Sequence, residues 1–323
     1  MLLPLPAILH RSPGLDPDRI GLVVCVPTFR RPEGLAATLR SLMGQDIAEP
    51  FAVVVAENDA AGAAGAAAAI QLLDGRALHG LCVAEPVQGN CSAINAAFGA
   101  ALAAFPRARA VLMIDDDEVA SVGWLRLMAE AASHTGADIV GGPVRPRFRE
   151  ARAGAVLGRH PAFAPAYRRT GPVPVIYGTG NCLIRRSVFD ELDRPALDPR
   201  FNHLGGGDTD FFTRCRVAGL SFHWVEDAGV EEDVPAERTR FGWLVRRSLR
   251  IGAVNFHVER GVMPGWRVAA RNLLAWPGSL ARAAAALLRT GSPRLASHPV
   301  LVALGRSLAA LGVEPHQYRA RRA

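Results

Sequence analysis

The stretch AVLMIDDDE, residues 110–118, decides the fold. Five apolar residues lead directly into Asp115, Asp116 and Asp117, and Glu118 follows them. A short, uninterrupted apolar run is typical of a strand that is buried on both faces of a parallel sheet. Carboxylates that come straight after such a strand lie at its carboxyl end, where open α/β sheets bind ligands. The stretch therefore predicts an α/β sheet with a polar site at one edge.

The chain before this stretch repeats the same pattern. Apolar runs predict further buried strands over residues 20–26, 51–56 and 81–85. The segments between them have helical spacing and predict helices over residues 33–43, 60–73 and 92–105, the last with Ser92 as its N-cap. Alternation of strands and helices predicts a mostly parallel sheet.

The second half of the chain is less regular. Residues 143–174 hold six prolines, which predicts a long irregular loop. Short strands are expected over residues 173–177 and 181–184, and helices over 208–218 and 241–252. The tail from Trp266 is expected to form two or three helices, broken by Pro277, Pro293 and Pro299.

The amino-acid composition limits the kinds of ligand site that the chain can form. The chain has 323 residues, of which 50% are hydrophobic, so a large core is available. It contains no lysine, and all 37 basic residues are arginine. A P-loop nucleotide site and a pyridoxal Schiff base both need a lysine and are excluded. Arginine still binds phosphate bidentately, so a phosphate ligand remains possible.

The net charge of +7 is concentrated late in the chain. From Gly265 onward there are nine arginines and one acid, Glu314. This asymmetry favours an anionic partner. Nucleic acid is disfavoured, since aromatic residues make up only 7% of the chain. Apolar stretches at 268–274 and 280–288 lie among arginines, which fits either a helix at a membrane surface or a helical cap packed on the main domain.

The cysteines and the N-terminal residues bear on the cellular location of the protein. The five cysteines are odd in number and form no CxxC motif, so we expect buried free thiols and a reducing, cytoplasmic compartment. Residues 1–9 are apolar but contain Pro4 and Pro6 and lack a basic start, so we expect no signal peptide. No apolar stretch reaches the length of a membrane span, although peripheral membrane contact remains possible.

The acidic stretch suggests a metal. Adjacent carboxylates repel one another, and a hard divalent ion such as Mg²⁺ or Mn²⁺ relieves that repulsion while bridging to substrate phosphates. The alternative is a solvated acidic turn without a ligand.

Several motifs together carry a resemblance over about residues 20–255. They are VVCVPTFRRPEGLAATLRSL from residue 23, VVVAENDA from 53, QGNCSAINAAF from 88, MIDDDE from 113, YGTGNCLI from 177, GGGDTDFF from 205 and VEEDVPAER from 230. The sequence resembles the family 2 inverting glycosyltransferases, which have the GT-A fold. Within that family it is similar to the bacterial polysaccharide-assembly enzymes of the succinoglycan glucosyltransferase type.

The resemblance implies a set of site residues. The nucleotide-sugar site would contain Pro27, Thr28, Arg30, Glu57, Asn58, Asn95, Asp115, Asp116, Gly180 and Asn181. Asp117 and Asp115 would hold Mg²⁺ or Mn²⁺, joined by Asp233 at a position where many relatives have a metal-binding histidine. Ile94 stands where an arginine is common in the family.

The same resemblance makes Asp208 the catalytic base that takes the acceptor's proton. A plain helix N-cap is the alternative for Asp208, and the two roles are compatible. Gly207, Asp210 and Tyr177 would contact the acceptor, with Gly207 replacing the family's usual glutamate.

The implied activity is transfer of a sugar, with inversion, from a nucleotide-diphosphate sugar to a saccharide or lipid-linked acceptor, in cell-surface polysaccharide or glycan synthesis. UDP is the commonest nucleotide in the family. The implied organisation is a nucleotide-sugar half at residues 18–118, an acceptor half at 119–255 and a basic helical region at 256–323. Two alternatives remain open. One is a sugar nucleotidyltransferase, for which PTFRRPEG is a poor phosphate loop. The other is a non-catalytic nucleotide-sugar-binding scaffold.

Overall fold

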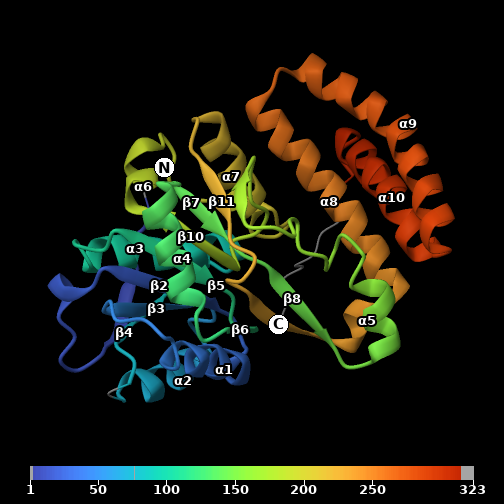
Figure 1. Cartoon of the computed structure of the whole chain (residues 1–323). Coiled ribbons are helices and arrows are strands. Elements are labelled where there is room, and N and C mark those ends of the chain that lie inside the picture. Colours follow the sequence, from blue (N-terminus) through green and yellow to red (C-terminus); the bar gives the residue numbers. More distant parts are fainter. Residues whose placement is uncertain (1–2, 76, 314–323) are drawn as a thin grey trace.

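A nine-stranded sheet forms the centre of the part of the chain that the computed structural model describes, residues 3–75 and 77–313 (Figure 1). The strand order is β1-β4-β3-β2-β5-β10-β7-β11-β9. The strands are β1 Ala7–Arg11, β2 Leu22–Thr28, β3 Phe51–Glu57, β4 Gly80–Ala84, β5 Ala110–Ile114, β7 Ile139–Gly141, β9 Gly171–Val173, β10 Asn181–Arg185 and β11 Phe222–Trp224. Strands β4, β3, β2 and β5 are parallel, whereas β10 pairs antiparallel with β5 and β7. The predicted α/β fold is confirmed.

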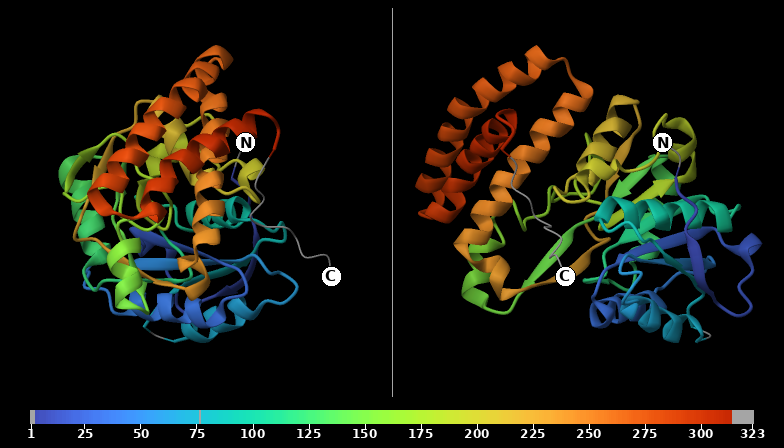
Figure 2. Two further views of the ribbon diagram at one scale, coloured as in Figure 1. Left: turned by 90° about the vertical axis from the view of Figure 1, so that its right-hand side faces the viewer. Right: turned by 180° about the vertical axis from the view of Figure 1, so that it is seen from behind.

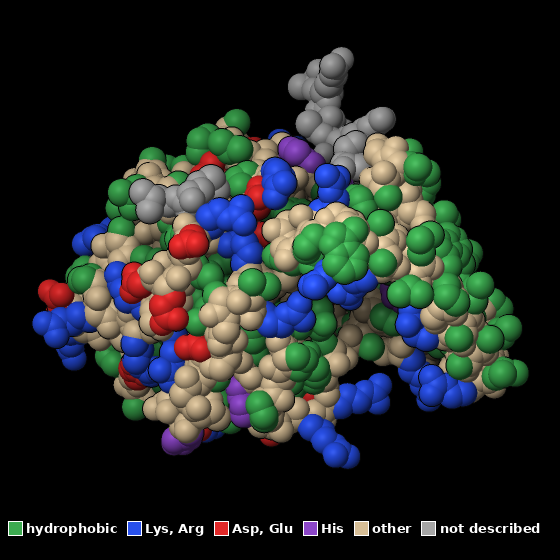
Figure 3. All heavy atoms as spheres, turned by 90° about the horizontal axis from the view of Figure 1, so that it is seen from above, with side chains coloured by type: hydrophobic (Ala, Val, Ile, Leu, Met, Phe, Trp, Pro, Cys, Tyr) green, Lys and Arg blue, Asp and Glu red, His purple; other side chains and the backbone are tan. Residues whose placement is uncertain are grey.

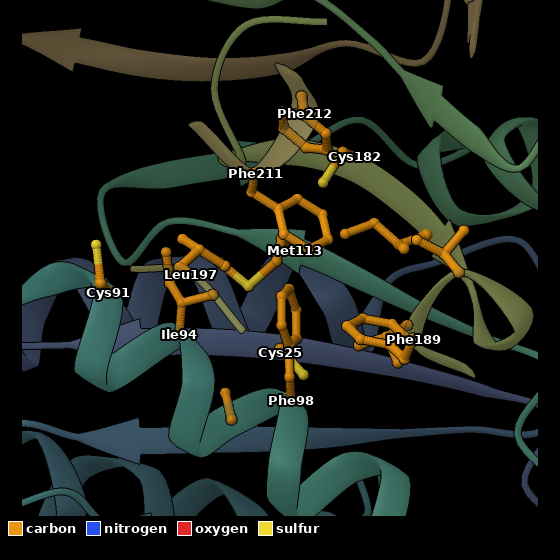
Figure 4. Packing of buried hydrophobic residues seen from close by; sticks show 14 of the residues in the cluster. Cys25, Cys91, Ile94, Phe98, Met113, Cys182, Phe189, Leu197, Phe211 and Phe212 are labelled. Atoms are coloured by element: carbon orange, nitrogen blue, oxygen red, sulfur yellow. The ribbon is translucent and has the colours of Figure 1, made fainter. Parts of the chain in front are cut away.

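Helices cover both faces of this sheet. One face carries α1 Pro32–Met43, α2 Ala64–Leu73 and α4 Trp124–Thr135, and the other carries α3 Asn90–Ala104, α6 Arg186–Glu191 and α7 Gly207–Val217. Side chains of β2 alternate between the two cores: Val23 and Cys25 face the α3 side, and Val24 faces the α1 side. Burial on both faces explains why the strands are apolar throughout. Figure 4 shows the packing between α3 and α7, with Phe98 and Phe211 in its centre.

A second sheet lies beside the carboxyl end of β5. It contains β6 Glu118–Ala120, β12 Val230–Val234 and β8 Val144–Phe148, in the order β6-β12-β8. The loop predicted over residues 143–174 is therefore partly wrong, because this segment contains β8, α5 Ala151–Leu157 and β9. The partner of β8 is β12, far along the chain, so local composition could not reveal the strand.

The C-terminal helices form a separate layer next to the sheet (Figure 2). They are α8 Phe241–Val262, α9 Gly265–Thr290 and α10 Pro293–Ala310. The breaks predicted at Pro277 and Pro299 are wrong, because both prolines lie inside helices. Helix α10 packs against both α8 and α9, and α8 packs against α7. Short 3₁₀ turns complete the chain at Pro17–Arg19, Pro199–Phe201 and Ala236–Thr239.

Two helix starts differ from prediction because of side-chain contacts. Helix α2 begins at Ala64, since the Glu57 carboxylate accepts a hydrogen bond from the backbone N–H of Ala66 at 2.8 Å. Helix α3 begins at Asn90, and Ser92 is not its cap. The Ser92 hydroxyl instead accepts from Asn202 Nδ2 at 2.9 Å. Strand β1 was not predicted, as its residues are largely exposed at the sheet edge.

All five cysteines are free and buried, as the sequence predicts. Burial raises the pKa of the Cys82, Cys91 and Cys215 thiols to about 12. Their thiolates are therefore scarce at neutral pH, and the cysteines serve as core residues.

Asn95 connects the two halves of the chain. Its Nδ2 donates to the Leu197 carbonyl at 2.8 Å, and its Oδ1 accepts from the Leu197 N–H at 2.8 Å. The pair joins α3 to the segment before α7. Both groups are buried, so the pair excludes water and fixes the distance between these elements.

We predict that Asn95→Ala lowers the free energy of unfolding by about 2 kcal/mol, because it leaves a buried N–H and a buried C=O of Leu197 without a partner. Urea denaturation measures this. Gln71→Ala, at an exposed position of α2, is the control and should stay within about 0.5 kcal/mol of the unmodified protein. Equal stability of the two variants would contradict the structural role.

Candidate active site

The antiparallel pairing of β5 with β10 brings two distant motifs together. Ile114, the last residue of β5, lies opposite Asn181, the first residue of β10. Asp115 and Gly180 are therefore neighbours. A Cβ atom on Gly180 would lie 2.9 Å from Asp115 Oδ2 and 2.6 Å from Glu118 Oε1. Only glycine leaves room for the carboxylates at this point.

Strand β12 adds a further acid to this group. Glu118 of β6 and Glu232 of β12 are direct partners in the second sheet. Like charges directly opposite each other destabilise a pair of strands. Glu118 Oε2 also accepts a hydrogen bond from the Asp115 N–H at 2.9 Å. We call Asp115, Asp117, Glu118 and Glu232 the acidic cluster.

The cluster is poorly compensated. Burial raises the pKa of Asp115 well above its usual value, and the charges of Asp117, Asp116, Glu232 and Asp208 raise it further. Burial and the charge of Asp115 likewise raise the pKa of Glu118. Perturbed carboxyl groups of this kind gather at functional sites.

Asp116 lies next to the cluster, shares Arg31 with Asp117 and has partners of its own. Its Oδ2 accepts from Thr28 Oγ1 at 2.9 Å and from the Phe29 N–H at 3.3 Å, and its Oδ1 pairs with Arg31 at 3.1 Å. Asp116 and Thr28 thus fasten the end of β2 to the end of β5. Burial still raises the pKa of Asp116.

Asp117 and Glu232 are the members of the cluster that contact arginines. Arg31 Nη1 donates to Asp117 Oδ2 at 2.6 Å, and Arg238 Nη2 lies 3.8 Å from the same oxygen. Arg238 also forms an ion pair with Glu232. Two arginines and two carboxylates therefore meet beside Asp115, in an arrangement that suits an anionic ligand with a cation.

The structure corrects the predicted placement of Asp233. Side chains alternate along β12, so Asp233 lies on the opposite face from Glu232. Asp233 pairs with Arg147 at 2.9 Å and is largely exposed. Its neighbour Glu232 takes the position facing the acidic cluster. The alternation was visible in the sequence, because Val230 and Val234 mark the inner face and Glu232 stands between them.

The chemistry of the acidic cluster fits Mg²⁺ or Mn²⁺. These ions take carboxylate oxygens, and the mutual repulsion of Asp115, Asp117 and Glu232 falls when a cation binds. Within the described residues, no three carboxylate, histidine or cysteine side chains are arranged to hold an ion by themselves. An ion here needs further ligands, which substrate phosphates supply in many magnesium sites.

Asp208 lies near Gly178, in the same glycine segment. It is the second residue of α7, and its Oδ1 accepts from the Thr209 N–H at 2.7 Å. Its Oδ2 lies 3.7 Å from the position of a Cβ on Gly178. The charge of Asp208 contributes to the raised pKa of Asp115, so the two carboxylates share one site.

Five residues of the predicted nucleotide-sugar site lie around the ends of β2 and β3. Pro27 and Thr28 end β2, next to Ala56 and Glu57 of β3. Arg30 is exposed and pairs with Asp59 at 2.7 Å. The side chains of Glu57 and Asn58 are already engaged by the backbone: Glu57 binds the N–H groups of Asp59 and Ala66, and Asn58 binds the 85–89 loop. The side chains of Glu57 and Asn58 therefore fix the backbone at this edge of the sheet and do not point unbonded polar groups into the site.

Other predicted residues have structural contacts. Asn95 binds Leu197, as described above, and Asn181 accepts from Trp124 Nε1 at 2.7 Å while donating to the Pro143 and Ala228 carbonyls. The two asparagines therefore fix the positions of the segments around the site through these hydrogen bonds.

The predicted acceptor residues differ in exposure. Asp210 is buried and pairs with Arg214 at 2.8 Å. Gly207 is buried against Cys91, whose Sγ would lie 2.3 Å from an added Cβ. Tyr177 is exposed, next to Gly178. Of the three, Tyr177 has a side chain open to a large ligand.

We predict that Asp115→Asn stabilises the ligand-free protein at about pH 8, by at least about 1 kcal/mol. When the pKa of a carboxyl group is raised in the folded protein above its usual 3.8, the free energy of unfolding falls as the pH rises from the unfolded pKa to the folded pKa. The gain should vanish near about pH 4, where the unmodified carboxyl is protonated. Urea denaturation at both values measures it, with exposed Asp193→Asn as control. A variant less stable than the unmodified protein at about pH 8 would show that repulsion does not dominate.

Comparison with known proteins identifies the family of the chain. Residues 23–193 match glycosyl transferase family 2. The succinoglycan biosynthesis protein ExoM of Rhizobium meliloti (strain 1021) is 33% identical over 262 residues, which cover 77% of this chain and 79% of ExoM.

Solved structures share the fold at low sequence identity. The mannosyltransferase PcManGT of Pyrobaculum calidifontis, in complex with GDP-Man and Mn²⁺, superposes with a TM-score of 0.58 at 18% identity, covering 94% of this chain and 90% of PcManGT. S. aureus TarS 1–349 with UDP gives 0.51 at 13% identity, covering 91% and 92%. Against a longer TarS chain, this chain spans 43% of the length. The family match, the ExoM relationship and the GT-A neighbours together establish that this chain is a member of glycosyl transferase family 2.

Proposed function

We propose that this protein transfers a sugar, with inversion, from a nucleotide-diphosphate sugar to a saccharide or lipid-linked acceptor in cell-surface polysaccharide or glycan synthesis. UDP is the nucleotide we expect. One observation carries the proposal: the β5–β10 pairing sets Asp115 against Gly180, and Asp208 lies near Gly178 of the same short segment. A donor site and a base thus meet at one glycine segment.

The donor's diphosphate would lie beside Asp117. Arg31 and Arg238, which contact Asp117, supply positive charge for the phosphates. Asp117, Asp115 and Glu232 would hold Mg²⁺ or Mn²⁺ together with the diphosphate. A divalent ion bound there stabilises the negative charge of the leaving nucleotide. The nucleoside would lie along Pro27, Thr28 and Arg30 at the ends of β2 and β3.

Asp208 would act as the base. Thr209 holds one oxygen of its carboxylate, Oδ1, and the other oxygen lies toward Gly178. This orientation suits removal of a proton from an acceptor hydroxyl as that hydroxyl attacks the sugar. Gly178 has a φ of 95°, a conformation that favours glycine, and its missing side chain lets the sugar approach the backbone.

The proposed organisation follows the chain. Residues 18–118 would bind the nucleotide sugar, residues 119–255 the acceptor, and residues 256–323 would form a basic helical region. Tyr177 would contact the acceptor from its exposed position. Five buried free thiols support a cytoplasmic location.

The relatives support the reaction class. The name of ExoM refers to succinoglycan biosynthesis, and PcManGT was solved with a nucleotide sugar and Mn²⁺. These facts concern those proteins. For this chain they favour a polysaccharide product and a divalent ion.

We predict that one of UDP, GDP and dTDP binds in isothermal titration calorimetry only when Mn²⁺ is present. Asp117→Asn should remove the metal-dependent part, and Glu232→Gln should weaken it by about tenfold, equivalent to about 1.4 kcal/mol. Asp233→Asn is the matched control and should bind as the unmodified protein does, since Asp233 faces Arg147. Equal losses for Glu232→Gln and Asp233→Asn would contradict the assignment of Glu232.

We predict that Asp208→Asn lowers the transfer rate by about 10² to 10⁴, the usual contribution of a general base, with nucleotide binding within about twofold. Exposed Asp190→Asn is the control and should transfer normally. The measurement is product formation from the donor that the calorimetry identifies. Normal transfer by Asp208→Asn would exclude this base, and nucleotide binding without any transfer by the unmodified protein would favour the scaffold alternative.

A further inference from the structure

The outer face of α9 is unusually apolar. Trp266, Leu273, Leu280 and Leu287 repeat every seven residues, which places them on one side of the helix within about 60° of one another. Leu274 and Leu288 widen this stripe. These six side chains are between 46% and 88% exposed, which is large for a continuous set. We call them the apolar stripe.

Arginines border the stripe on one side. Arg267, Arg271, Arg282 and Arg289 all project on the same flank of α9, and α9 contains no acid. Figure 3 shows hydrophobic side chains gathered over the C-terminal helices with basic side chains next to them. The arrangement is that of a helix lying in a membrane interface, with its apolar face among acyl chains and its cations at phosphate level.

A cavity lies at the arginine flank. It has a volume of about 350 Å³ and lies between α8, α9 and α10. Its walls include Arg271, Arg282, Arg306 and Leu274 of the stripe, together with Glu259, whose carboxylate pairs with Arg271 and Arg306. The three arginines exceed the one acid, so a phosphate group at the cavity would meet the Arg282 guanidinium while its chain lay along the leucines. This combination suits an anionic amphiphile.

Two other occupants fit less well. A second copy of this chain would pair the stripe with itself and set arginines against arginines, since α9 has no acid to oppose them. Residues 314–323 have the sequence EPHQYRARRA, which offers no Leu, Ile, Val or Phe to cover the stripe and adds three arginines. Within the described residues, no helix is long and apolar enough to span a bilayer.

We propose that α9 docks this protein on the surface of an anionic lipid membrane through the apolar stripe and its arginine flank. The packing of the helices then connects the membrane surface to Asp208. Helix α9 packs on α10, α10 on α8, and α8 on α7, where Val254 of α8 lies against Gly206, two residues before Asp208. Docking would thus bring the acceptor side of the site near a lipid-linked acceptor, but vesicle binding itself does not depend on the proposed reaction.

Vesicle flotation with the full chain and no donor tests the proposal. We expect the protein to float with vesicles containing about 30% phosphatidylglycerol and to float at least tenfold less with pure phosphatidylcholine. Leu273→Glu combined with Leu280→Glu should lower flotation at least tenfold. The control combines Val122→Glu with Val217→Glu, two equally exposed apolar residues elsewhere on the surface, and should float as the unmodified protein does. Circular dichroism confirms that each variant is folded.

Tryptophan emission gives a second measurement. Trp266 emission should shift to shorter wavelength on vesicle binding, and Trp266→Phe should remove most of the shift, because Trp266 is 68% exposed, Trp124 and Trp224 are buried, and Trp243 and Trp276 are partly buried. Failure of the unmodified protein to float, or equal flotation of both double variants, would overturn the proposal. So would light scattering that shows a dimer which Leu273→Glu dissociates, since a second copy would then cover the stripe.

Discussion

The repulsion among buried carboxylates at the end of β5 is the constraint on which the rest of the site depends. Asp115, Glu118 and Glu232 all have raised pKa values, and their main cause is burial without enough positive charge. A fold selected only for stability would remove such a group. This chain keeps the buried carboxylates. Gly180 leaves room for them, and the Asp116–Thr28 hydrogen bond holds two strand ends together beside them.

Sequence alone could predict the parallel half of the sheet, since each strand there is a local apolar run. It could also predict the acidic edge and helix α7, since MIDDDE and GGGDTDFF stand at element boundaries. It could not predict β8, whose partner β12 is distant, or the position of Glu232 opposite Glu118. Asn95 and Asn181 fit the family motifs, but their side chains bind backbone groups of distant loops. A motif identifies a position, whereas the direction of a side chain depends on partners elsewhere in the chain.

Two departures from the family pattern have physical explanations here. Ile94 is fully buried in the core beside Phe98, where an arginine would lose its hydration without a partner. Gly207 lies against Cys91, so any side chain would need the cysteine to move. Both positions belong to the packing between α3 and α7 rather than to the ligand site. Isoleucine at position 94 and glycine at position 207 are therefore compatible with catalysis.

The insertion of β10 between β5 and β7 also limits how the protein can be divided. A fragment that ended after Glu118 would keep the four parallel strands but would leave one side of β5 without a partner. Its backbone N–H and C=O groups would then form an open edge, with the apolar side chains of β5 uncovered by the later helices. Exposed edges of this kind recruit other chains. The segment up to Glu118 is thus part of one folding unit, and the isolated segment would be expected to aggregate.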